Sequence, residues 1–161
     1  MTDTFRTSDG IRLAYYIDDY TDPWTTPDTV LMLHSAMGSA KRYYAMVPGL
    51  ARRYRVVRLD LRGHGASQVP SLDAPLSLER LAKDAVELLD HLKVAKAHVI
   101  GSSAGGFITQ RLAMNHPDRV KSISLIASKP GLKRSQASTW LAQVEAIGLR
   151  NFLAKTISDR Y

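Results

Sequence analysis

The 161-residue chain is 45% hydrophobic and 23% charged, which is typical of a globular protein that can build a core. Its net charge is +7, but the basic residues are scattered, without interleaved aromatic residues or a recognition helix, so nucleic-acid binding is not expected. The absence of cysteine excludes disulfides and thiolate metal sites, and we expect neither a metal nor a cofactor. With no apolar run of membrane-spanning length and no signal-peptide pattern, we expect a cytoplasmic protein that does not bind membranes.

The first half of the chain predicts a hairpin, a buried strand and a helix. Residues 4–7 and 11–18 alternate around Ser8-Asp9-Gly10, which is typical of a β-hairpin. The apolar run 30–33 ends abruptly in small and polar residues, as a buried parallel strand does. A helix is expected over residues 39–53, in which the sequence Pro-Gly marks a kink or an early end.

A second strand, over residues 54–59, runs into the glycine-rich loop from Asp60 to Ser67. The clearest helix follows over residues 77–92. Ser77 is its expected N-cap, and its apolar residues recur at three- and four-residue spacing: Leu78, Leu81, Ala85, Leu88 and Leu92. Alternating strands and helices from residue 30 onward predict a mostly parallel sheet with helices on both faces.

The most informative stretch is Gly101-Ser102-Ser103-Ala104-Gly105, which reads G-x-S-x-G between a strand-like and a helix-like run. A sharp strand-turn-helix elbow strains its serine and exposes the hydroxyl oxygen at the sheet edge. Glycines on either side of the serine avoid clashes in so tight a turn. The spacing selects Ser103 as a nucleophile, because Ser102 would be flanked by Ile100 and Ala104. A serine- and glycine-rich turn without chemistry is the alternative.

With these motifs, the chain resembles the α/β-hydrolase superfamily over essentially its whole length. His34-Ser35 resembles the oxyanion-loop motif, residues 60–67 resemble D-x-R-G-H-G-x-S, and the combination is most similar to 3-oxoadipate enol-lactonases and small carboxylesterases. The resemblance implies Ser103 as the nucleophile and the backbone N–H groups of Ala36 and Ala104 as the oxyanion hole. A small-molecule ester or lactone is the implied substrate.

The same resemblance requires an acid and a histidine after the serine, in that order. The one later histidine, His116, falls at the far end of the predicted helix, where a surface helix terminus is the simpler interpretation. His34 and His64 resemble loop-bracing positions, and His91 and His98 fall on a helix end and a strand start. We therefore expect the acid and the base to come from outside this chain, either from a C-terminal fragment or continuation or from a partner chain.

Residues 1–128 are predicted to form the N-terminal part of the hydrolase core, with a sixth strand over 121–128, and residues 129–161 the beginning of a helical lid. The family's seventh and eighth strands would be absent, which would leave the sixth strand as an apolar sheet edge. In the lid, Trp140 and Phe152 either pack on the sheet edge or line an acyl pocket.

Three classes of function are consistent with the sequence. The first is a serine hydrolase that cleaves an ester or lactone through an acyl-enzyme on Ser103. The second is a carbon–carbon bond hydrolase of ring-cleavage products, although residues 34–38 depart from the glycine-rich H-G-x-G-P-G loop usual in that subfamily. The third is a pseudo-hydrolase that only binds a ligand. A serine in place of an aspartate at position 103 argues against haloalkane dehalogenases and epoxide hydrolases.

Overall fold

The computed structural model describes residues 2–71, 73–130 and 137–158, and the chain divides into two compact units, Met1–Pro130 and Gly131–Tyr161. The first unit contains a six-stranded sheet with the order β1-β2-β4-β3-β5-β6. Its bounds are β1 Asp3–Arg6, β2 Arg12–Asp18, β3 Thr29–Leu33, β4 Arg55–Leu59, β5 Ala97–Ser102 and β6 Val120–Ile126. β1 and β2 form the predicted antiparallel hairpin, and β3 to β6 are mutually parallel.

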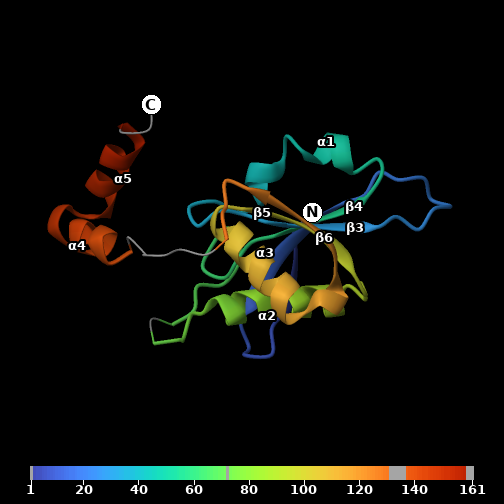
Figure 1. The fold of residues 1–161 in the computed structure, drawn as a ribbon, viewed down its shortest axis with the longest axis horizontal. Coiled ribbons are helices and arrows are strands. Elements are labelled where there is room, and N and C mark those ends of the chain that lie inside the picture. The colour runs from blue at the N-terminus through green and yellow to red at the C-terminus, as the bar shows by residue number, and fades with distance from the viewer. Residues whose placement is uncertain (1, 72, 131–136, 159–161) are drawn as a thin grey trace. The chain divides into compact units, whose positions relative to one another are not determined.

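Helices cover both faces of this sheet (Figure 1). α2 (Leu78–His91) and α3 (Ala104–Asn115) lie on one face, while the 3₁₀ helix η1 (Ala40–Tyr43) and the short α1 (Val47–Leu50) lie on the other. A second 3₁₀ turn, η2 (Pro117–Arg119), leads into β6. The predicted α/β architecture is therefore confirmed.

The sheet has one core on each of its faces. Alternate residues of the central strands point to opposite faces, so that Leu31, Leu33 and Val99 pack beneath α2 and α3 while Val30 and Met32 pack beneath α1 and η1. All five residues of β3 are buried, as expected for the centre of a parallel sheet.

The prediction of a single helix over residues 39–53 is wrong. The structure has η1 and α1 instead, separated by residues 44–46. Pro48 lies in the first turn of α1, where its missing N–H costs nothing, but it cannot continue a preceding helix.

The α2 helix begins as predicted, because the Ser77 side chain accepts a hydrogen bond from Arg80 N at 3.1 Å. Its expected apolar stripe is only partly correct. Leu78 is 38% exposed, and the buried face is formed by Ala82, Ala85, Leu88 and Leu89.

The second unit holds α4 (Ala137–Ile147) and α5 (Leu149–Ser158), joined at Gly148. Gly148 adopts φ 77°, and its N–H donates to Val144 O at 2.8 Å, which ends α4. Phe152 is buried, whereas the side chain of Trp140 lies outside the described part of the structure. The predicted role of this unit as a lid remains a prediction.

Candidate active site

The sheet register brings the ends of four strands to one level. Leu33 pairs with both Leu59 and Gly101, and Gly101 pairs with Leu125. The residues that follow, among them His34, Asp60 and Ser102, therefore meet at one edge of the sheet. Between β3 and β5 the chain changes its direction of winding, which is where open α/β sheets bind ligands.

Ser103 connects β5 to α3 in the strained backbone conformation predicted for it. Its φ is 50° and its ψ is −111°, outside the regions that a residue with a side chain ordinarily adopts. The surroundings hold it there: Ser103 N donates to Ile126 O at 2.9 Å, and Ser103 O accepts from Ser128 Oγ at 2.7 Å. Strain of this kind persists only where neighbouring contacts over-determine it, and such positions cluster at functional sites.

The glycines around Ser103 are required by close packing. A Cβ on Gly105 would lie 1.9 Å from Leu33 O, and one on Gly101 would lie 2.4 Å from Gly105 O. A Cβ on Gly106 would lie 2.0 Å from Ser128 Oγ. The first turn of α3 thus packs directly against the backbone of β3, which explains the G-x-S-x-G-G pattern in steric terms.

The two backbone amides predicted to bind an oxyanion come from the two elements that pack here, the start of α3 and the loop after β3. Ala104 is the first residue of α3, where a helix has no internal partner for its N–H groups. Ala36 lies in the loop that follows β3. Among the hydrogen bonds of the described residues, neither of these N–H groups is a donor. Both amides are consequently free to bind an acceptor.

His34 orients the peptide that carries the Ala36 N–H. The ring is fully buried, its Nδ1 lies 2.8 Å from Ser35 O, and its Nε2 accepts from Leu61 N at 3.0 Å. This pattern requires a neutral ring with the proton on Nδ1. Burial lowers the pKa of His34, which favours the neutral form. Ser35 O and Ala36 N belong to one planar peptide, so fixing the carbonyl also fixes the N–H.

His64 holds the next peptide of the same loop. Its Nε2 contacts Ala36 O, and its Nδ1 lies 3.1 Å from Arg62 O. The rings of His34 and His64 lie side by side, with centroids 5.2 Å apart. Both histidines therefore brace the loop, as their sequence positions suggested.

The other three histidines lie in different surroundings. His91 contacts the Tyr15 hydroxyl, His98 contacts Ser122 Oγ at 2.8 Å, and His116 is the C-cap of α3. All five histidines belong to the described residues, and no hydrogen bond of that part of the chain joins any of them to Ser103.

Asp60 ties the two loops together. It is 1% exposed, and its carboxylate accepts from Ala40 N at 2.7 Å and from Ala66 N at 2.9 Å. A Cβ on Gly65 would lie 2.1 Å from Asp60 Oδ2, so glycine is required for the loop to pass so close. The carboxylate is thus occupied by backbone donors and serves to hold the loops.

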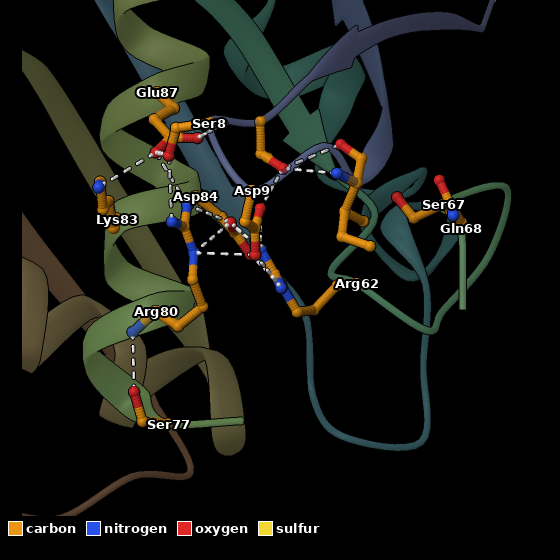
Figure 2. Close-up of polar contacts among 12 residues, drawn as sticks. Ser8, Asp9, Arg62, Ser67, Gln68, Ser77, Arg80, Lys83, Asp84 and Glu87 are labelled. Carbon is orange, nitrogen blue, oxygen red and sulfur yellow. Dashed lines mark hydrogen bonds and ion pairs between the residues drawn. The ribbon is translucent and has the colours of Figure 1, made fainter. Parts of the chain in front are cut away.

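Arg62 anchors the loop of residues 60–67 through ion pairs that sequence reasoning missed (Figure 2). Its guanidinium donates to Asp84 at 2.6 and 2.7 Å and to Asp9 at 2.9 Å, which joins the loop to α2 and to the hairpin turn. The Arg62 and Asp84 side chains are 2% and 1% exposed. Burial opposes the charged form of Arg62, but the hydrogen bonds to Asp84 and Asp9 outweigh it and raise its pKa.

Arg80 extends this network towards Glu87. It donates to Asp84 at 2.8 Å and pairs with Glu87 at 3.0 Å, while Glu87 also accepts from Ser8 Oγ at 2.6 Å. The contacts span up to 79 residues of sequence. The sequence gives a local signal for Arg80–Asp84 and Lys83–Glu87, which have the four-residue spacing of ion pairs along a helix.

The described residues contain no cluster of three or more His, Asp or Glu side chains that could hold a metal ion. Within the same residues, no helix is long and apolar enough to cross a membrane.

Comparisons with known proteins agree with the geometry. A dihydrolipoyllysine-residue acetyltransferase component of the acetoin cleaving system from Pseudomonas putida is 38% identical over 124 residues, which cover 77% of this chain and 33% of the relative. The 3-oxoadipate enol-lactonase 2 of Acinetobacter baylyi is 32% identical over 111 residues, covering 68% of this chain and 40% of the relative. The chain thus spans well under half the length of these two relatives.

The crystal structure of the enol-lactonase from Burkholderia xenovorans LB400 matches with a TM-score of 0.82 and 27% identity, covering 99% of this chain and 59% of that one. The family model of the alpha/beta hydrolase fold matches residues 28–155, which include β3 to β6 and the Ser103 turn. From the sheet order, the strained turn and these matches, we conclude that this chain belongs to the α/β-hydrolase family.

Proposed function

We propose that this chain carries the nucleophile and the oxyanion hole of a serine hydrolase that cleaves a carboxylic ester or lactone. Ser103 Oγ attacks the substrate carbonyl while a base takes its proton, and the N–H groups of Ala36 and Ala104 stabilise the oxyanion. The C–O bond of the ester or lactone then breaks, the alkoxide oxygen takes the proton back from the base, and water hydrolyses the acyl-enzyme to release the acid. The enol-lactonase relatives support this choice of substrate class.

The observation that carries the proposal is the backbone of Ser103, at φ 50° and ψ −111° directly before α3. A turn without chemistry would favour glycine in this conformation, because glycine has no Cβ and adopts positive φ at lower cost than serine. A half-buried serine at the end of a strand, next to backbone amides that are free among the described residues, is the arrangement that acyl transfer requires.

We further propose that the catalytic acid and histidine lie outside these 161 residues. His34 and His64 are engaged with backbone groups, and His91, His98 and His116 make their contacts elsewhere. β6 is the last strand of the described sheet, and its Ile123 and Ile126 are each 41% exposed, as an edge that accepts a further strand would be.

A fluorophosphonate probe tests the nucleophile. The probe is expected to label the full-length protein at Ser103, and Ser103→Ala is expected to abolish both labelling and ester hydrolysis. Ser102→Ala is the matched control, because the same atom is removed one residue away, and it should retain labelling. Labelling that survives in Ser103→Ala would refute the assignment.

Expression of residues 1–161 alone tests the second part. We expect this chain to show no turnover of ester substrates, since no histidine or carboxylate of the described residues is hydrogen-bonded to Ser103. Turnover by the isolated chain, abolished by His34→Gln or His64→Gln, would mean that one of these histidines acts as the base.

A further inference from the structure

A small cavity lies at the carboxyl edge of the sheet and is lined by residues that adjoin Ser103. It has a volume of about 160 Å³ and is bounded by the loop after β3 (His34, Ser35), by η1 (Arg42, Tyr43) and by the ends of β5 and β6 (Ser102, Ile126). Ser102 precedes Ser103, and Ile126 O accepts from Ser103 N. At about 30 Å³ for each water molecule, the cavity holds a group of only a few heavy atoms.

Arg42 is an uncompensated cation at this cavity. Arg42 is exposed, and among the described residues its guanidinium has no ion pair and no hydrogen bond, whereas Arg58 pairs with Asp18 at 2.7 Å and Arg62 with Asp84 at 2.6 Å. No acidic residue is found among the described residues that line the cavity. Since His34 is held neutral, Arg42 is the one charged side chain among the described residues that line this pocket. The buried Asp60 carboxylate lies behind His34, and its charge also acts on that ring.

The side chain of Arg42 is directed along the oxyanion loop. Its Cδ lies 2.5 Å from the place that a Cβ on Gly38 would occupy, so the aliphatic stem runs over that glycine. The absence of a side chain at position 38 therefore makes room for Arg42. The Tyr43 hydroxyl donates to Leu33 O at 2.7 Å, which fixes η1, and with it Arg42, to the end of β3.

We propose that Arg42 determines specificity by binding a carboxylate of the substrate, so that the enzyme prefers small anionic esters or lactones to neutral ones. A planar guanidinium matches a carboxylate with two parallel hydrogen bonds. A substrate whose ester carbonyl lies at Ser103 would place a carboxylate a few bonds away within reach of Arg42. This inference rests on the proposed serine-hydrolase function and narrows its substrate class.

Monomethyl succinate and dimethyl succinate provide a matched pair for the test, since they differ by one methyl group and one charge. In the full-length protein, Arg42→Gln is expected to lower kcat/KM for the monoester at least about tenfold, the loss typical of a charge-assisted hydrogen bond, and to leave the diester unchanged. Arg42→Lys should recover part of the loss, because it keeps the charge without the planar fork.

Lys41→Gln is the control for long-range attraction, because it removes the same charge from the neighbouring residue, which does not line the cavity. Equal losses for both substrates in Arg42→Gln, or an equal loss for the monoester in Lys41→Gln, would overturn the proposal.

Binding of succinate to the Ser103→Ala variant, measured by calorimetry, separates this inference from the proposed function. Succinate affinity that falls at least about tenfold when Arg42→Gln is added supports the role of Arg42 even if Ser103 proves not to be the nucleophile. Succinate affinity that is unchanged by Arg42→Gln overturns the inference, whether or not the serine mechanism holds.

Discussion

Gly105→Ala tests the packing that positions the candidate site. The added Cβ would lie 1.9 Å from Leu33 O, 2.5 Å from Leu33 C and 2.8 Å from His34 O, all backbone atoms that no side-chain rotation can move. Ordinary contact begins at 3.4 Å, so α3 and β3 must separate by about 1.5 Å. Overpacking of this kind costs about 3 kcal/mol or more.

For a chain of this size, that cost corresponds to a fall in Tm of about 6–12 °C, which differential scanning calorimetry measures directly. The displacement also moves Ala104 away from Ala36, and a misplacement of about 1 Å can lower the rate roughly a hundredfold. In the full-length protein, ester hydrolysis should therefore fall further than the folded fraction alone explains.

Gly49→Ala is the matched control, since a Cβ there meets no atom within 4 Å and Gly49 has an ordinary φ within α1. This change should leave Tm unchanged or raise it slightly, because alanine restricts the unfolded chain. A Gly105→Ala variant with wild-type Tm and activity, or an equal loss in Gly49→Ala, would refute the steric argument.

Three further predictions concern the surrounding structure. Asp84→Asn should lower the free energy of unfolding in urea by about 3–5 kcal/mol, because it leaves the buried Arg62 without its main partner. Lys83→Ala on the same helix should change it by less than about 0.5 kcal/mol, and similar losses in the two variants would contradict this prediction. Ser77→Ala should destabilise by about 1 kcal/mol through loss of the α2 cap, and a neutral result would show that the cap is dispensable. Burial lowers the pKa of His34, so the unfolded chain takes up a proton at this residue at higher pH than the folded chain does. The free energy of unfolding should therefore decline as the pH falls from about 6.5 through the pKa of the folded state. That decline should be shallower in His34→Gln, and an unchanged pH dependence would mean that His34 is not its source.

The sequence alone determined the local features of this protein. The Ser77 cap and the Ser8-Asp9-Gly10 turn each depend on a few adjacent residues, whose backbone preferences can be recognised in the sequence. The G-x-S-x-G spacing likewise marks Ser103, although contacts with Ile126 and Ser128 hold its strained backbone. The order of strands and helices is likewise predicted by the sequence, because the spacing of apolar residues differs between strands and helices. The prediction of one helix over residues 39–53 is wrong, because two short helices form there. Proline restricts only the residues next to it, and packing on the sheet determines the conformation of the others.

Which distant groups meet depends on the three-dimensional arrangement of the chain. Arg62 reaches Asp9 across 53 residues and Asp84 across 22, and no pattern in the chain predicts these pairs. Likewise, Arg42 differs from the other basic residues in lining this cavity without an ion pair to any described residue. The physical reason is that ion pairs and cavities depend on distances in space, which the sheet register sets, whereas turns and caps depend on dihedral preferences that each residue carries with it.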